Sequence, residues 1–342
     1  MSARRQSRLR LRQRGAAILI AMLIMTLVAT LAAGMVWLQW RGIEVETAER
    51  ARGQGEWLLN AALDWGNLIL RSSIRNGHAE DDLTQPWATP LAETKLSSFL
   101  SADGTHSEDS GPEAFLTGQI TDAQSKYNLY DLVIDPTQVR SEIIRLQKLC
   151  DAIGVSQQVA QQIASGFSES YTAQAASAPG GSSQPSATTA ALMPREVGDL
   201  VWFGIDPKVV KQLEPFIEII PLSGTTLVPI NANTAPAEVL MAADDSITRA
   251  VAEQMIQKRQ QKPFMTTAEV RTAGGIGATG NLASGALPAF KSLLDVQSSY
   301  FEIYGQLRYE QNVIRERSVI YRVSPAVVQV LRRERLPPDA PA

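Results

Sequence analysis

Residues 16–40 read AAILIAMLIMTLVATLAAGMVWLQW, a run without a single charged residue. As a helix rising about 1.5 Å per residue, this run is longer than the roughly 30 Å of hydrocarbon in a bilayer. Six arginines crowd the residues before it, whereas Glu44, Glu46 and Glu49 follow it. The positive-inside rule therefore predicts one membrane span, with the N-terminus in the cytoplasm and the chain after Trp40 exported.

The junction between the basic leader and the apolar run reads Gln13-Arg14-Gly15-Ala16-Ala17-Ile18-Leu19-Ile20. It resembles the site that prepilin peptidases cut, directly after a glycine, so the mature chain would begin at Ala16. The apolar run is too long for the roughly 7–15 residues of a cleaved secretory signal. A weak signal-peptidase site at Ala32-Ala33-Gly34 and an uncleaved anchor remain the alternatives. Pilin-like subunits usually carry glutamate as the fifth mature residue, and this position is Ile20.

The composition of the 342 residues limits the chemistry that the chain can carry out. A formal net charge of -3 argues against bulk electrostatic binding to nucleic acid. Cys150 is the only cysteine, which excludes an intrachain disulfide and a cysteine metal cluster. The only histidines, His78 and His106, lie in polar sequence typical of loops. We therefore expect no catalytic site, and a function based on assembly.

After the membrane span the pattern alternates between helix and strand. Helical spacing continues from Val45 to about Arg71, and the polar residues 78–114 are expected to form loops with a short helix at Leu91–Leu100. Short strands are predicted at Ala114–Ile120 and Asn128–Ile134.

A helical block follows these strands. Asp135 is expected to cap a helix that begins with Pro136 and places Val139, Ile143, Leu146, Leu149 and Ile153 on its buried face. A second helix is predicted from Ser156 to about Phe167, and the uncharged residues 172–191 should be a flexible insert.

Strands return at the end of the chain, at Ser299–Tyr309 and Val313–Val323, with a turn at 310–312 and a third candidate at Val327–Leu331. Strands on both sides of a helical block predict an α+β fold. We expect a long N-terminal transmembrane helix that continues into a pilin-like antiparallel sheet domain with a large all-helical insertion. The predicted parts are a cleaved leader (1–15), the N-terminal helix (16–75), the first part of the sheet domain (76–134), the helical insertion (135–295), the C-terminal strands (296–336) and a tail (337–342).

Two further segments point to a family. The first is Gly118-Gln119-Ile120-Thr121-Asp122 through Asn128-Leu129, and the second is Pro229-Ile230-Asn231-Ala232-Asn233-Thr234-Ala235-Pro236-Ala237-Glu238-Val239-Leu240. Together with the leader they resemble the type II secretion system minor pseudopilin K, in the right order along nearly the whole chain. The resemblance marks five motif residues: Asp122, Asn128, Asn231, Asn233 and Thr234.

This resemblance implies a position at the tip of a short periplasmic pseudopilus, needed for export of folded proteins across the outer membrane. The implied partners are minor pseudopilins I and J, with H as a further candidate, the prepilin peptidase and the inner membrane. In the family, the first helical unit usually ends in an acidic segment that could bind calcium. The matching stretch Ile163–Tyr171 offers only Glu169, so we expect no cofactor, and calcium is the one metal left open.

Three other functions fit single features. Residues 233–259 resemble a helix-hairpin-helix DNA binder, with Asn233 or Thr234 capping a helix and a second helix at Ser246–Arg259. The hairpin, however, holds Asp244 and Asp245 where glycine should approach phosphate, so we expect no nucleic acid partner.

The other two alternatives, a dinucleotide-binding site and an exported enzyme, have weaker support in the sequence. Gly275–Gly280 fits the G-x-G-x-x-G dinucleotide pattern, but helical sequence precedes it where a strand is required. Asp122 and Asp131 could form a carboxylate pair in an exported enzyme, although two aspartates beside a turn usually act as caps.

Overall fold

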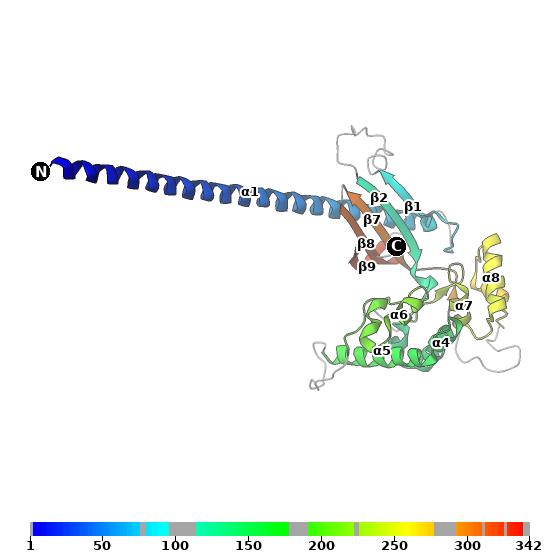
Figure 1. The fold of residues 1–342 in the computed structure, drawn as a ribbon. Helices are drawn as coiled ribbons and strands as arrows, with labels where there is room; N and C mark the ends of the chain where they lie inside the picture. The colour runs from blue at the N-terminus through cyan, green and yellow to red at the C-terminus, as the bar shows by residue number, and fades with distance from the viewer. Residues whose placement is uncertain are drawn as a thin grey trace. The chain divides into compact units, whose positions relative to one another are not determined.

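The computed structural model (Figure 1) describes residues 3–75, 80–95, 114–177, 191–221, 226–276, 292–309, 312–324 and 327–337. The chain is divided into two compact units, the first ending at Leu58 and the second beginning at Leu59. His78, His106, most of the glycine-rich motif and the turn residues Glu310 and Gln311 lie outside the described ranges.

Helix α1 runs without a break from Ala3 to Arg75. Its part up to Leu58 lies in the first unit, and its remaining turns belong to the second unit. Its apolar side chains between Ile18 and Trp40 are exposed in the isolated chain. Among the described helices, this one is long and apolar enough to cross a membrane. The predicted long N-terminal helix is therefore confirmed, and Gly53 and Gly55 do not interrupt it.

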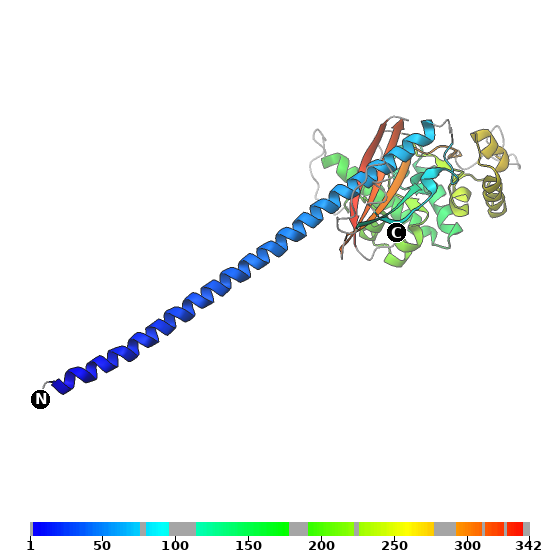
Figure 2. The same cartoon turned by 90° about the horizontal axis from the view of Figure 1, so that it is seen from above.

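The second unit contains a five-stranded antiparallel sheet in the order β1-β2-β7-β8-β9, with strands side by side in Figures 1 and 2. Its strands are β1 (Leu91–Lys95), β2 (Ala114–Asp122), β7 (Tyr300–Tyr309), β8 (Asn312–Ser324) and β9 (Val327–Leu336). The helix predicted at Leu91–Leu100 is wrong, because Leu91–Lys95 pairs with β2; residues 96–100 are not described.

The last turns of α1 cover one face of this sheet, as Figure 2 shows from above. Leu63 and Leu70 of α1 are buried against Ile120, Phe301 and Ile303 of the strands. Because side chains alternate along a strand, every second residue of β2 and β7 lies on this face. The short 3-10 helix η1 (Pro86–Ala88) adds Trp87, whose ring meets Phe301 edge-on at 5.3 Å between centroids.

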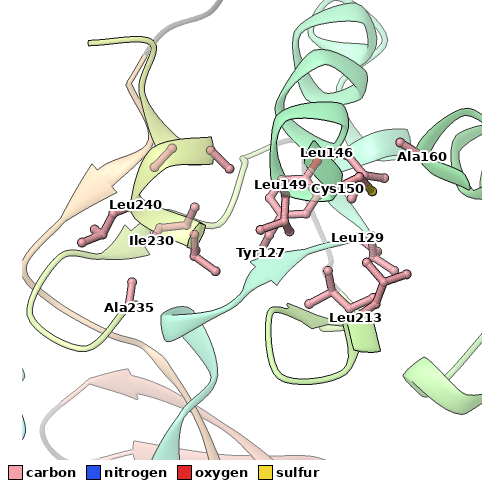
Figure 3. Packing of buried hydrophobic residues seen from close by; sticks show 14 of the residues in the cluster. Tyr127, Leu129, Leu146, Leu149, Cys150, Ala160, Leu213, Ile230, Ala235 and Leu240 are labelled. Atoms are coloured by element: carbon pink, nitrogen blue, oxygen red, sulfur yellow. The ribbon is translucent and has the colours of Figure 1, made fainter. Parts of the chain in front are cut away.

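The chain between β2 and β7 is mainly helical and has a separate core (Figure 3). Its elements are η2 (Ala123–Ser125), β3 (Tyr127–Asn128), α3 (Asp131–Ile134), α4 (Val139–Ala152), α5 (Gln157–Ser177), η3 (Val197–Phe203), α6 (Pro207–Leu213), β4 (Ile217–Glu218), β5 (Ile230–Asn231), α7 (Ala237–Ala243), α8 (Arg249–Gln261), α9 (Thr267–Ala273) and β6 (Leu294–Asp295). Leu146 and Leu149 of α4, Leu213 of α6 and Leu240 of α7 are fully buried in this core. The predicted α+β class is confirmed, with two short parallel strand pairs, β3–β4 and β5–β6, among the helices.

The start of this helical segment differs from the prediction. No long strand forms at Asn128–Ile134, because the side-chain oxygen of Asn128 accepts the N–H of Tyr130 and the chain turns into α3. Asp135 does not cap α4; its carboxylate accepts the N–H of Thr137 at 2.9 Å, and α4 begins later, at Val139. These short side chains form local turns before the helix can begin.

Two further boundaries also differ. Helix α5 continues to Ser177, into the range predicted to be flexible, and residues 178–190 lie outside the described ranges. Neither Asn233 nor Thr234 caps α7, whose N-cap is Pro236 without a side-chain hydrogen bond. Both side chains are engaged elsewhere, in the cluster described next.

Candidate functional site

A buried polar cluster joins the sheet to the helical segment at the end of β2. One carboxylate oxygen of Asp122, Oδ2, accepts hydrogen bonds from Asn231 Nδ2 at 2.9 Å and from the hydroxyls of Thr234 and Ser298 at 2.6 Å each. The other oxygen accepts the backbone N–H of Gln124 at 2.8 Å. Four donors from three segments of the chain thus converge on one carboxylate, which is 4% exposed.

An ion pair supports this carboxylate from the sheet side. The carboxylate of Asp81 accepts Arg322 Nη2 at 2.5 Å and the backbone N–H of Ser298 at 2.8 Å. Asn231 Nδ2 also donates to the carbonyl of Asp81 at 2.9 Å. The guanidinium of Arg322 lies 4.7 Å from the ring centroid of Phe301. Because both charges are buried, removing either partner would leave an uncompensated charge.

Gln124 ties together the two chain connections that cross between sheet and helices. Its side-chain oxygen accepts the N–H groups of Ser299 and Tyr300, and its nitrogen donates to the carbonyl of Pro229 at 2.7 Å. The connection after β2 is thereby bonded to the connection before β7. We call the side chains of Asp81, Asp122, Gln124, Asn231, Thr234, Ser298 and Arg322 the polar joint.

Asn233 extends the joint toward α8 and α9. Its side chain exchanges two hydrogen bonds of 2.9 Å with the backbone of Phe264, and its N–H donates to Asn231 Oδ1 at 2.9 Å. Arg259 Nη1 donates to the carbonyls of Ala232 and Ala235 at 2.7 Å each. The motif loop therefore satisfies its backbone groups with side chains, as a buried loop must.

Asn128 belongs to a neighbouring cluster. Its side chain accepts the N–H of Ile220 at 2.9 Å and donates to Asp131 at 3.1 Å, and Asp131 accepts the N–H of Val228. Asn128 and Asp131 therefore hold the segment around β4 and the chain that follows it. Asp122 and Asp131 each accept hydrogen bonds from their own set of protein donors.

The buried carboxylates are strongly perturbed. Burial raises the pKa of Asp122 to about 6, although hydrogen bonds from Ser298 and Thr234 act in the opposite direction. Burial also raises the pKa of Asp131 well above its ordinary value, and the charge of Glu142 adds to this effect. Such shifts also occur at catalytic sites, but here each carboxylate oxygen already has protein donors.

A set of ion pairs surrounds the joint. Lys126 Nζ lies 3.3 Å from a carboxylate oxygen of Glu218 and of Glu302, and Arg332 Nη2 lies 3.5 Å from Glu218. Burial alone would lower the pKa of Lys126, but these two carboxylates raise it above its ordinary value. Charges from β7, β9 and the helical segment therefore compensate one another at this boundary.

Of the five motif residues, Asp122, Asn231 and Thr234 meet directly, Asn233 joins them through Asn231, and Asn128 does not. Sequence reasoning missed Asp81, Gln124, Ser298 and Arg322, which complete the joint. Within the described ranges, no group of three or more histidine, cysteine or acidic side chains is placed to hold a metal ion. The arrangement is suited to holding two parts of a protein together.

The remaining site predictions occupy other places. Gly15, Ala16 and Ile20 lie in α1, and the side chain of Ile20 is exposed. In the hairpin between α7 and α8, the carboxylate of Asp244 is buried and accepts the N–H of Ser246 at 2.8 Å, and Asp245 pairs with Lys148. The glycine-rich motif follows helix α9, so the strand that a dinucleotide site requires is absent at this described position.

The comparisons agree with this geometry. A sequence profile of the type II secretion system protein K family matches residues 230–296, which include the Asn-Ala-Asn-Thr loop and the approach to Ser298. The type II secretion system protein K of Pectobacterium carotovorum subsp. carotovorum is 25% identical over 346 residues, covering 95% of this chain and 97% of that protein. Both comparisons show that the chain is similar to the type II secretion system protein K family.

A solved structure shows the same fold. A chain in the crystal structure of the GspK-GspI-GspJ complex from the enterotoxigenic Escherichia coli type 2 secretion system matches with a TM-score of 0.61 at 20% identity. The match covers 85% of this chain and 98% of the chain in that complex. With 85% of this chain covered, the likeness in fold includes both the sheet and the helical segment.

Proposed function

We propose that this minor pseudopilin of the type II secretion system occupies the tip of the pseudopilus and begins the fiber. Its neighbours would be minor pseudopilins I and J, with H as a further candidate, and the assembly would serve export of folded proteins across the outer membrane. The structural relative was solved in complex with GspI and GspJ, which supports these partners.

Ile20 is the observation that carries the tip position. If the chain is cut after Gly15, Ile20 is the fifth mature residue, where pilin-like subunits usually carry glutamate. A carboxylate inside hydrocarbon is costly and needs a partner, such as the N-terminal amine of the subunit above it. A subunit with nothing above it has no such amine to meet. An uncharged residue such as isoleucine at this position fits a first subunit.

The size of the helical segment supports the same position. The chain between β2 and β7 forms its own core, and the polar joint fixes it to the end of β2. In a fiber of stacked subunits, a second copy placed directly above would have to accommodate this additional segment. The proposed arrangement therefore has a single copy at the tip and no homopolymer.

The membrane arrangement is part of the proposal. Cleavage by a prepilin peptidase between Gly15 and Ala16 would remove the basic leader and retain the apolar run of α1. The mature protein would remain in the inner membrane, with the bulk of the chain in the periplasm. The uncharged run and the arginines before it support this orientation.

Site-specific cross-linking in membranes tests the tip position. A photoreactive amino acid at exposed positions of α1, such as Trp57 or Leu68, should capture pseudopilins I or J in cells that assemble the system. Cells lacking I and J supply the control. Adducts between two copies of this chain, or adducts with only the major subunit, would contradict a single copy at the tip.

A further inference from the structure

The two edge strands of the five-stranded sheet differ in how they are protected from pairing with another strand. Strand β1 is five residues long, contains Glu93 and Lys95, and shifts register between Leu91 and Thr94. Short length, charged side chains and irregular register are the usual devices that keep an edge strand from pairing with another chain. The β1 edge is therefore protected.

The first part of β9, at the opposite edge, has no such charges. It reads Val327-Val328-Gln329-Val330, and the exposed fractions of Val327 and Val330 are 45% each. Among the described strands β9 has one neighbour, β8, and no described backbone hydrogen bond outside the β8–β9 ladder involves it. The free N–H and C=O groups of an edge strand are a template for one further strand. What fits this edge is therefore an extended peptide backbone.

A groove of about 730 Å³ begins where this uncharged run ends. Leu331 and Arg332 of β9 line the groove, together with Arg195 and with Trp202 of η3, which is 47% exposed. Arg332 donates to the carbonyl of Arg195, which places Arg195 beside the edge strand. A segment paired along β9 would reach the groove within a few further residues, because each extended residue adds about 3.3 Å.

The charge of the groove favours a carboxylate. Its charged lining residues are Arg195 and Arg332, and no acidic residue lines it among the described residues. Arg332 pairs with Glu218 and Glu334. Arg195 is exposed, and its guanidinium forms no ion pair with a described acidic side chain. A free guanidinium near an exposed indole ring fits an acidic residue that is next to an aromatic or aliphatic one.

We propose that the edge of β9 and this groove bind an extended segment of another protein, which adds one strand to the sheet and places a carboxylate on Arg195. The backbone of Val327–Val330 would supply the hydrogen bonds, and Trp202 and Arg195 would supply the preference for sequence. Antiparallel addition continues the pairing pattern of this sheet. The proposal depends neither on the tip position nor on the membrane anchoring.

Peptide binding to the full chain in detergent tests the strand addition. The probe is acetyl-Asp-Phe-Thr-Val-Thr-Val-amide with a fluorophore at its C-terminus, ordered so that antiparallel pairing brings its acidic end to the groove. Two matched peptides carry backbone N-methyl groups, one on both threonines and the other on both valines. An added strand donates alternate N–H groups to its neighbour. One methylated peptide should therefore bind roughly tenfold more weakly by fluorescence anisotropy, and the other should bind like the parent.

Equal affinities of the two methylated peptides would overturn the strand addition, because they differ only in which N–H groups are blocked. The absence of saturable binding by the parent peptide would overturn it as well.

Arg195→Ala tests the groove. Because this side chain is exposed and pairs with no described acidic residue, the variant should fold normally and bind the peptide about tenfold more weakly. It should not change the affinity for the same peptide with asparagine in place of aspartate. Arg140→Ala is the matched control, since Arg140 is an exposed arginine of α4 that does not line the groove. An equal loss with both peptides would overturn the assignment of the carboxylate to Arg195.

A second copy of this chain is the competing occupant of the edge. If β9 pairs with β9 of another copy, light scattering should show a dimer of the full chain in detergent that the parent peptide dissociates. This result would overturn the assignment to a different protein. A monomer that binds the peptide supports it.

Discussion

The hydroxyl of Thr234 lies 2.6 Å from the carboxylate of Asp122, which is 112 residues earlier in the chain. The bond joins the motif loop of the helical segment to the last residue of a sheet strand. Both residues belong to the sequence motif that resembles the protein K family. In this protein the motif residues connect the helical segment to the end of strand β2, and the motif contains the side chains that form this connection.

Removing the acceptor should therefore destabilise the second unit. Asp122→Asn replaces one carboxylate oxygen by an amide nitrogen that faces donors, and we expect a loss of about 3 kcal/mol in unfolding free energy at neutral pH. Thermal or denaturant unfolding followed by circular dichroism measures it. Thr234→Ser keeps the hydroxyl and is the matched control; Thr234→Val should cost about 1–2 kcal/mol. If Asp122→Asn left the unfolding free energy unchanged, the polar joint would contribute little to stability.

The pH dependence of the unfolding free energy should reflect the titration of Asp122. Its pKa is raised by burial from 3.8 to about 6, so the folded state binds the proton more tightly than the unfolded state. The resulting stability is fully present below pH 3.8 and is lost as pH rises through about 6, a change of roughly 3 kcal/mol. The difference in stability between the native protein and Asp122→Asn should therefore widen as pH falls from 7 to 4. Glu302 shifts in the same direction and is present in both proteins, so the difference isolates Asp122.

Processing at the leader gives a simple mass measurement. We predict a mature chain that begins at Ala16 and stays in the membrane fraction. Gly15→Val should block the cut, because the branched side chain occupies the position before the scissile bond. Gly15→Ala adds one methyl group and should retain part of the cleavage. A retained Met1, or a start near Met35, would contradict processing by a prepilin peptidase.

Introducing a charge at Ile20 tests the proposed tip position. Ile20→Glu should impair membrane assembly or secretion, because the new carboxylate has no amine above it to meet. Ile20→Gln, of nearly the same shape without the charge, should be less harmful. Secretion of a reporter substrate and the amount of protein in the membrane are the measurements. Better incorporation of Ile20→Glu along the fiber would mean that the native protein is an ordinary subunit.

Nucleic acid binding can be tested directly on the purified full chain. Asp244 and Asp245 lie in the hairpin between α7 and α8, and Asp244 is buried, so no glycine-lined surface is available there to approach phosphate. We expect only weak, nonspecific retention of duplex DNA at physiological salt. Micromolar binding that weakens steeply with added salt would support the helix-hairpin-helix alternative.

The sequence predicted the elements whose periodicity is local. Strands β7 and β8 were located from alternating aromatic and β-branched residues, and α1 was located from its uncharged run. Strand β1 was missed because Leu91–Lys95 has no strand pattern of its own; it is a strand only because β2 pairs with it.

Helix α4 shows a second limit. The apolar positions correctly predicted a helix, but two of the residues on its buried face are charged. Arg145 Nε lies 3.1 Å from a carboxylate oxygen of Glu142, which also accepts the hydroxyl of Tyr127. Burial of a charge depends on a partner in space, and hydropathy does not report it.

The sequence motif contains three of the seven side chains of the polar joint. The motif provided Asp122, Asn231 and Thr234, but Ser298 bonds to Asp81 across 217 residues and Arg322 bonds to Asp81 across 241 residues. Single serine, aspartate and arginine residues at such separations have no pattern that a sequence alone could reveal. Their role appears only after the strands and helices are assembled.

Asp122 at the end of β2 lies directly opposite Phe301 near the start of β7. Residues 123–300 therefore stand where two adjacent antiparallel strands would ordinarily be linked by a tight turn of a few residues. The whole helical segment enters and leaves through a single gap between two neighbouring strands. A genetic event that inserted it, or one that removed it, would leave the pairing of β2 with β7 intact. The fold thus provides a route by which an ordinary hairpin could have gained a domain in one step.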